Sequence, residues 1–223
     1  MTFEPFFTEL NGLFARYLSS ASREAQHSYC TPENRYRFGS QGQVERLIAA
    51  AELCTKHFSG DLVEIGCFEG STSKHLCKVA KQYSRKLICV DPWETGTQNC
   101  EGSEYNAFLE ATKEYRDTTE IIRKSSMHPD VVSTLRSREI AFAYVDGLHT
   151  LDACFSDIKT VGHCYGIIAV DDLPWCREVR QAIAKSLFQF DFEWFGNPYM
   201  REGYLFHRPK SEREFLQGTR DKL

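Results

Sequence analysis

The stretch VEIGCFEGS, which runs from Val63 to Ser71, decides the fold of this chain. An apolar segment leads into a turn with two glycines four positions apart, Gly66 and Gly70, and a helical pattern of apolar residues follows. Glycines in such a turn let the backbone bend sharply and approach a ligand closely. The spacing GxxxG differs from the GxGxxG of a dinucleotide pyrophosphate cradle, so the stretch favours a cofactor without phosphates.

Short apolar runs alternate with helical patterns after this point, as a parallel sheet covered on both faces requires. The final two runs have only a short segment with Gly196 between them, and they predict a hairpin. We therefore predict an α/β fold: a Rossmann-like, seven-stranded, mostly parallel sheet with helices on both faces and a C-terminal antiparallel hairpin. The expected strands are Asp61–Ile65, Lys86–Val90, Thr119–Arg123, Ile140–Val145, Tyr165–Val170, Phe190–Phe195 and Gly203–His207.

The length of 223 residues suits a single α/β domain. We expect an N-terminal cap over residues 1–42, a core over 43–209 that begins with a helix from Gln43 to Phe58, and a charged tail over 210–223. The polar stretch from Trp93 to Tyr105 is long for a connection in such a sheet. It is either a surface excursion or a lid over the substrate.

The composition limits the classes of function. With 42% hydrophobic and 26% charged residues, the chain should fold around a packed core. A net charge of −4 argues against a nucleic-acid partner, and no segment resembles a signal peptide or a membrane span. The nine cysteines are odd in number and form no CxxC pair, which is typical of reduced thiols. We predict a cytoplasmic protein that acts on small molecules.

An acidic residue, Asp91, ends the second expected strand about twenty residues beyond the glycines, where a carboxylate can accept hydrogen bonds from both ribose hydroxyls. Asp91 could instead be a turn residue or a helix cap. The glycine turn and Asp91 occur in the right order on the right elements, and together they favour a cofactor that carries a nucleoside.

The first strand, the GxxxG turn and Asp91 resemble motifs I and II of the class I S-adenosylmethionine-dependent methyltransferases, and the likeness covers roughly residues 43–207. This resemblance implies S-adenosylmethionine as the cofactor. The cofactor-binding residues that it implies are Glu64, Gly66 and Gly70 around the methionine moiety, with Cys67, Phe68, Glu69 and Ser71 in the same turn, Asp91 at the ribose, Ser125, Ser126 and Met127 beside the adenine, and Asp146.

Four further polar residues follow the next two strands. Asp146 and His149 belong to the segment DGLH after the fourth strand, and Asp171 and Asp172 end the fifth. Adjacent strand ends should bring all four into one crevice beside the cofactor. Crowded carboxylates need a cation, protonation or hydrogen bonds, and oxygen ligands suit Mg²⁺.

Each of these residues also has an ordinary structural interpretation. Asp172 could cap the next segment, Asp171 could bind backbone amides, and His149 could be a structural or surface residue. The combination of DGLH with the pair Asp171-Asp172 favours the metal site.

The pattern DGxH, a helix and then DD resembles the metal-dependent small-molecule O-methyltransferases, including the macrocin and mycinamicin sugar O-methyltransferases and the cephalosporin-hydroxylase-like group. In those families the matching positions bind Mg²⁺, and the histidine is the general base in some members. The resemblance implies Mg²⁺ on Asp146, Asp171 and Asp172, with His149 as the catalytic base. The implied substrate is a small molecule with a hydroxyl, such as a sugar or a natural-product scaffold.

Two other functions fit the same sequence. One is metal-independent methylation of a nitrogen or a carboxylate, and the other is a subunit that binds S-adenosylmethionine without turnover. The aromatic residues near the N-terminus also suggest a surface that covers a second copy of the chain. These residues are Phe3, Phe6, Phe7 and Phe14.

Overall fold

The computed structural model describes residues 4–27, 40–94, 102–196 and 200–207. Its sheet has seven strands in the order β3-β2-β1-β4-β5-β7-β6. The five strands β1 to β5 are parallel, whereas β7 runs antiparallel to both β5 and β6. The predicted fold class is therefore confirmed. The strands are β1 (Asp61–Ile65), β2 (Leu87–Val90), β3 (Thr119–Ile122), β4 (Ile140–Val145), β5 (Ile167–Val170), β6 (Glu193–Phe195) and β7 (Gly203–Phe206).

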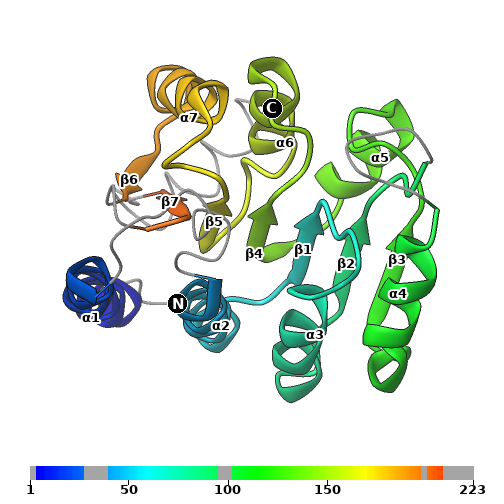
Figure 1. Cartoon of the computed structure of the whole chain (residues 1–223), viewed down its shortest axis with the longest axis horizontal. Helices are drawn as coiled ribbons and strands as arrows, with labels where there is room; N and C mark the ends of the chain where they lie inside the picture. Colours follow the sequence, from blue (N-terminus) through cyan, green and yellow to red (C-terminus); the bar gives the residue numbers. More distant parts are fainter. Residues whose placement is uncertain (1–3, 28–39, 95–101, 197–199, 208–223) are drawn as a thin grey trace.

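Helices cover both faces of this sheet (Figure 1). Those labelled α1 to α4 lie on one face and α5 to α7 on the other, and each layer has its own buried apolar cluster. Successive side chains of a strand point to opposite faces, so Leu62 joins the first cluster and Val63 the second. The helices are α1 (Glu4–His27), α2 (Ser40–His57), α3 (Ser73–Gln82), α4 (Glu104–Ala111), α5 (Pro129–Arg136), α6 (Leu151–Thr160) and α7 (Arg177–Gln189), with a short 3₁₀ turn at Lys113–Tyr115.

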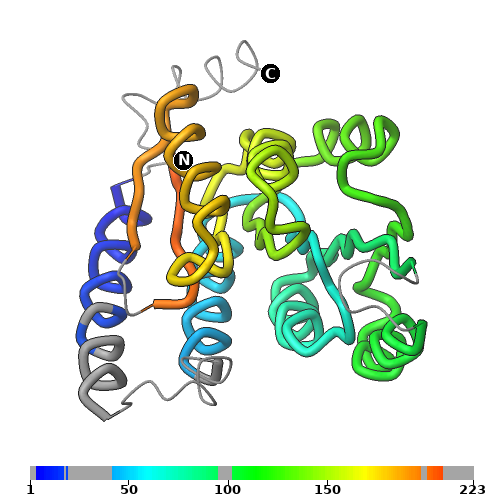
Figure 2. The backbone as a smooth tube through the Cα atoms, turned by 45° about the horizontal axis from the view of Figure 1, so that its top comes forward, coloured from blue at the N-terminus to red at the C-terminus, as the bar shows by residue number. Residues whose placement is uncertain are grey.

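Helix α1 packs beside α2 and the antiparallel strands β6 and β7 (Figure 2). The ring of Phe14 stacks on Phe195 with centroids 3.9 Å apart, and Phe6 packs edge-on against Phe58. Both N-terminal rings are buried within the chain. Phe6 and Phe14 therefore do not form an exposed surface for a second copy. Phe3 lies outside the described residues, and a homo-oligomer remains a prediction.

Five predicted strands are shorter in the structure, and the sixth differs most. The sixth strand covers Glu193–Phe195, whereas the sequence predicted Phe190–Phe195. Phe190 ends helix α7, and its ring stacks near Phe155 of α6 with centroids 6.0 Å apart. The residues before Glu193 thus pack against helices instead of pairing in the sheet.

The described part of the chain contains no helix that is long and apolar enough to cross a bilayer. The seven cysteines within it are all free thiols. Asn197 and Pro198, in the segment between β6 and β7, lie outside the described residues.

Candidate active site

The glycine turn leaves β1 at the point where the strand order reverses, between β1 and β4. The amide of Gly66 donates to the main-chain oxygen of Val90, and the amide of Asp146 donates to that of Ile65. A Cβ on Gly66 would lie 2.0 Å from the main-chain oxygen of Asp146, and φ is +87° there. Only glycine fits at this position, so the turn lies directly against the end of β4.

The carboxylate of Asp91 ties this turn to the end of β2. Its Oδ2 accepts hydrogen bonds from the amides of Cys67 (2.9 Å) and Phe68 (3.0 Å), and its Oδ1 accepts one from the amide of Trp93 (2.8 Å). The indole of Trp93 in turn donates to the main-chain oxygen of Phe68 at 2.7 Å. Asp91 thus has the turn-residue role that the sequence left open, and its ribose role stays a prediction.

Three of the four described non-glycine residues with positive φ lie at this edge of the sheet, and the fourth, Ser84, lies between α3 and β2. Phe68, Trp93 and Asp172 have φ values of +47°, +44° and +59°, which L-residues rarely adopt. They follow β1, β2 and β5 respectively. Strained residues cluster where a ligand site over-determines the backbone, so this edge is the candidate site.

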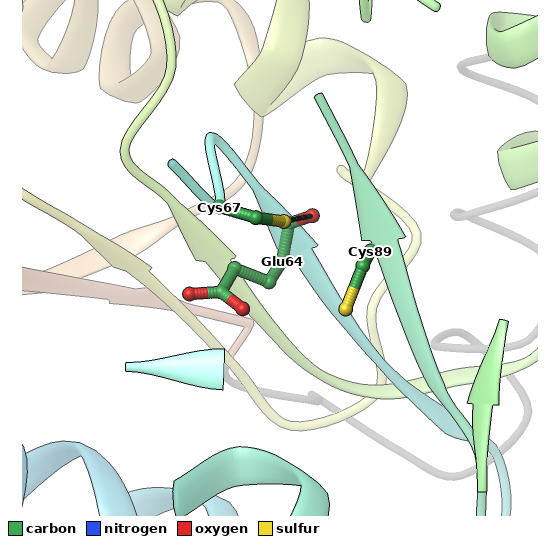
Figure 3. A group of neighbouring side chains, drawn as sticks. All are labelled: Glu64, Cys67 and Cys89. Carbon is green, nitrogen blue, oxygen red and sulfur yellow. Dashed lines mark hydrogen bonds between the residues drawn. The ribbon is translucent and has the colours of Figure 1, made fainter. Parts of the chain in front are cut away.

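Glu64 is fully buried beneath the glycine turn. It pairs in register with Cys89 of β2, and Figure 3 shows both side chains near Cys67, whose thiol donates to the main-chain oxygen of Glu64. Burial, with further repulsion from Asp146 and Asp91, raises the pKa of Glu64 to about 8. Its Oε2 has no hydrogen bond of normal geometry among the described residues, although the nearby Ser73 hydroxyl offsets part of the rise in pKa. A neutral carboxyl with an unsatisfied oxygen is poised to accept a polar or cationic ligand group.

Asp146, His149 and Asp172 converge at the ends of β4 and β5. Nε2 of His149 lies 3.4 Å from Oδ1 of Asp146 and 3.0 Å from Oδ2 of Asp172. The hydrogen bond to Asp146 raises the pKa of His149, burial opposes this, and Asp172 adds to the rise. One ligand atom from each residue lies within 4.8 Å of the other two, so the group can hold a metal ion.

Asp171 does not belong to this group and instead binds two residues that the sequence did not single out. Its Oδ1 accepts a hydrogen bond from Nε2 of Gln43 at 2.6 Å, and Nε of Arg201 lies 3.1 and 3.0 Å from its two oxygens. Nη2 of Arg201 also reaches Oδ1 of Asp172 at 3.2 Å. Burial and repulsion from Asp146 raise the pKa of Asp171. Burial lowers the pKa of Arg201, but Asp171 and Asp172 more than offset this and raise it.

Topology explains how Gln43 and Arg201 arrive here. Helix α2 precedes β1, so its first turn lies at the edge where the parallel strands end. Strand β7 runs antiparallel to β5, and Gly203 pairs with Val170. Arg201 therefore enters the sheet beside the residues that leave it at Asp171.

Residues 63–173 match a family model described as a methyltransferase domain. The match includes the glycine turn, Asp91, the DGLH segment and Asp171-Asp172. The chain is a class I S-adenosylmethionine-dependent methyltransferase. No curated protein matches its sequence.

Solved structures share the fold of this methyltransferase. The O-methyltransferase NovP is 16% identical with a TM-score of 0.54, and the match covers 75% of this chain and 79% of that one. CalS11, a TDP-rhamnose 3′-O-methyltransferase of calicheamicin biosynthesis, is 14% identical with a TM-score of 0.57, over 89% and 94% of the two chains. A Podospora anserina methyltransferase bound to S-adenosylhomocysteine is 14% identical with a TM-score of 0.55, over 74% and 79%.

The other predicted cofactor residues of the methyltransferase lie along the same edge. Glu69 and Ser71 are exposed in the glycine turn. Ser125, Ser126 and Met127 follow β3, and Met127 is exposed. The structure adds Asp157 of α6, which the sequence did not indicate: its buried carboxylate lies close to Gly147, and a Cβ on that glycine would be 3.1 Å from Oδ2.

The predicted lid of the methyltransferase is described only at its two ends, because residues 95–101 lie outside the described part. Trp93 is buried and packs on Tyr105 and Phe108, with ring centroids 5.0 and 4.8 Å away. A cleft beside the ends of β2 and β3 is lined by Pro92, Trp93, Glu94, Gly102 and Arg123. Both ends of the stretch are thus anchored at the site, and the choice between a lid and a surface excursion stays open.

Proposed function

We propose that this methyltransferase transfers the methyl group of S-adenosylmethionine to a hydroxyl of a small molecule, with Mg²⁺ bound beside the cofactor. The observation that carries the proposal is the convergence of Asp146, His149 and Asp172 at the strand edge next to the glycine turn. The amide of Asp146 bonds to the main chain of Ile65, one residue before Gly66. The acidic group and the cofactor turn are therefore parts of one site.

The residues present fit the cofactor. Gly66 and Gly70 both have positive φ, so the turn can follow the tight path that brings its backbone to this edge of the sheet. Below it, the unsatisfied oxygen of Glu64 fits the ammonium group of the methionine moiety, because a cation favours the ionised carboxylate. Asp91, at the end of β2, would hold the ribose.

The residues also fit a hard divalent ion, with one change from the sequence-based ligand set. Asp146 and Asp172 offer carboxylate oxygens toward the group, and Mg²⁺ is commonly held by one or two carboxylates while it keeps several waters. The third predicted ligand, Asp171, is bound to Gln43 and Arg201 instead. When bound, the ion would act as a Lewis acid that lowers the pKa of the substrate hydroxyl.

His149 is the proposed general base. Asp146 and Asp172 both contact Nε2 of its ring, and its side chain is about one-third exposed, so a substrate can reach it. It would take the proton from the substrate hydroxyl as the oxygen attacks the methyl group. Holding the two reactants in line supplies much of the rate.

Two observations support a ring-shaped substrate. Leu148 and Trp175, which flank the acidic group in the sequence, are each nearly half exposed and offer apolar surface beside it. The structural relatives include a TDP-rhamnose 3′-O-methyltransferase and the O-methyltransferase NovP. A sugar or another hydroxylated natural-product scaffold is the substrate class we propose.

The test combines binding with turnover. Calorimetry with S-adenosylhomocysteine measures the cofactor site, and methyl transfer to a panel of hydroxylated small molecules is then assayed with and without a chelator. We expect binding, and turnover that the chelator abolishes. His149→Ala should lose most turnover but keep binding, whereas His75→Ala on α3 should change neither.

The alternatives predict different results. Turnover that survives the chelator would favour a metal-independent methyltransferase acting on a nitrogen or a carboxylate. Binding of S-adenosylhomocysteine without any turnover would favour a non-catalytic subunit. Absence of that binding would contradict the proposal that the chain uses S-adenosylmethionine.

A further inference from the structure

We propose that Arg201 is a built-in cation that competes with Mg²⁺ for the carboxylates of Asp171 and Asp172 and so sets the metal affinity of the site. This inference rests on the proposed function, because it assumes that Asp146 and Asp172 hold the divalent ion. It goes beyond that function by naming the residue that controls how tightly the ion binds.

The guanidinium of Arg201 bridges two neighbouring carboxylates. Its Nε lies 3.0 Å from Oδ2 of Asp171, and its Nη2 lies 3.2 Å from Oδ1 of Asp172. The two acids are 1% and 9% exposed at their side chains, so water screens these pairs little. The other oxygen of Asp172 faces His149. Asp172 is thus shared between the guanidinium and the candidate metal group.

This arrangement has two consequences for a divalent ion. Asp171 cannot turn toward the ion while Arg201 and Gln43 hold both of its oxygens. An ion on Asp146 and Asp172 would also lie close to a second positive charge, which repels it. Arginine stays protonated at any working pH. The repulsion between Arg201 and the divalent ion therefore persists as long as the guanidinium stays in place.

Arg201 has a second contact beside the site. Its guanidinium lies 5.0 Å from the ring centroid of Trp175, which is nearly half exposed. The main chain of Arg201 is held separately, because its carbonyl oxygen accepts a hydrogen bond from the amide of Leu173 at 2.9 Å. A cation–π contact with an indole stabilises a guanidinium. The indole of Trp175 therefore helps to hold the guanidinium beside the two carboxylates, where it opposes a divalent ion.

The experiment titrates Mg²⁺ alone into the full-length protein and follows the heat of binding. Arg201→Gln removes the charge and frees Asp171, so we expect Mg²⁺ to bind at least about tenfold more tightly than to the wild type. Arg201→Lys keeps a charge that cannot bridge both carboxylates at once, and its affinity should fall between the two. Arg180→Gln is the matched control, because that guanidinium bonds only to the main-chain oxygens of Leu173 and Pro174 among the described residues.

The sign of the change separates competition from a purely structural role. A structural role predicts that loss of Arg201 weakens Mg²⁺ binding or leaves it unchanged, and either result in both Arg201 variants would overturn the inference. If Arg201→Gln does not fold, Arg201→Lys alone decides the sign. Calorimetry with S-adenosylhomocysteine on the same samples tests the cofactor site independently, so failure of the methyltransferase proposal would be visible separately.

Discussion

Asp157 provides a direct test of the electrostatics at the cofactor edge. It lies on α6, its residue is 1% exposed, and neither carboxylate oxygen has a hydrogen bond of normal geometry among the described residues. Burial raises the pKa of Asp157 to about 7, and the nearby Ser126 hydroxyl offsets only part of this rise. Asp157 is therefore a buried acid that ionises only near neutral pH.

The direction in which stability changes with pH follows from the pKa of Asp157 in the folded and in the unfolded state. An aspartate in the unfolded chain has a pKa of about 3.9, so the folded state holds this proton more tightly than the unfolded state. The stability that the proton contributes is complete below about pH 4 and is lost as the pH rises to about 7. Each pH unit in this window is worth about 1.4 kcal/mol, so the wild type loses about 4 kcal/mol in total. Asp157→Asn has no proton to lose and avoids this loss.

The assay is urea unfolding of wild type and Asp157→Asn at about pH 5 and about pH 8. Two pH units of the window lie above pH 5, so the free-energy advantage of the variant should grow by about 3 kcal/mol between the two conditions. Other titrating groups are common to both proteins and cancel. Asp152→Asn is the matched control: it lies on the same helix with an exposed side chain, so its substitution should change stability by less than about 0.5 kcal/mol.

An equal advantage at both pH values would refute the reasoning, because it would mean that Asp157 loses its proton as an exposed aspartate does. A smaller advantage at the higher pH would refute the sign. Binding of S-adenosylhomocysteine should be measured on the same samples, since Asp157 lies beside Gly147 of the DGLH segment and near Ser126 of the predicted adenine site.

Three other substitutions test the geometry of the site and its support. Gly66→Ala should abolish binding of S-adenosylhomocysteine in calorimetry, because its Cβ would lie 2.0 Å from the main chain at the end of β4; retained affinity would contradict this. Asp91→Asn should destabilise the fold by about 1–3 kcal/mol in urea unfolding and weaken cofactor binding, because an amide NH₂ must face at least one backbone N–H that the carboxylate now accepts. Arg46→Met should cost about 3–5 kcal/mol, since it removes the positive charge that pairs with the fully buried Glu202 and leaves that carboxylate with the neutral Tyr204 hydroxyl. Lys56→Met, which breaks an exposed ion pair, should cost less than about 1 kcal/mol in the same assay, and a similar loss for both variants would argue against the burial effect.

The strands could be predicted because parallel strands that are buried on both faces need continuous apolar runs. All six residues of Ile140–Val145 are buried, as this argument requires. The expected helix from Gln43 to Phe58 was also confirmed, as α2 over Ser40–His57. The sixth strand was too long in the prediction, because Phe190 and Phe192 are as apolar as strand residues but pack against helices. An apolar pattern indicates that residues are buried, but it does not indicate which helix or strand they pack against.

The convergence of Asp146, His149 and Asp172 was predictable for a topological reason. Parallel strands end at one edge of a sheet, so residues that follow adjacent strands meet there. The direction of each side chain was not predictable from the same pattern. Asp171 and Asp172 are neighbours in sequence, yet only Asp172 contacts His149, and the chain turns at Asp172, where φ is +59°.

Gln43 and Arg201 were missed because their partners are distant in the chain: Gln43 lies 128 residues from Asp171, and Arg201 lies 30 residues from it. No local motif marks either residue. One signal was present, since three crowded carboxylates require positive charge. Many basic residues could have supplied that charge, and only the antiparallel entry of β7 identifies Arg201.

The three acids at this edge differ in how much of each carboxylate remains for a ligand. Asp171 is 1% exposed and is bound by Gln43 and Arg201, Asp172 is 9% exposed and is shared between Arg201 and His149, and Asp146 is 26% exposed. Burial thus decreases from the first acid to the last, although Asp146 also has two partners, the Tyr144 hydroxyl at 3.3 Å and His149 at 3.4 Å. A buried carboxylate must lose its partners before it can bind an ion, whereas a more exposed one can also exchange water. We therefore expect distinct roles for identical residue types: Asp171 supports the fold, Asp146 is the acid most open to a ligand, and Asp172 is connected to Asp171 through Arg201 and to Asp146 through His149.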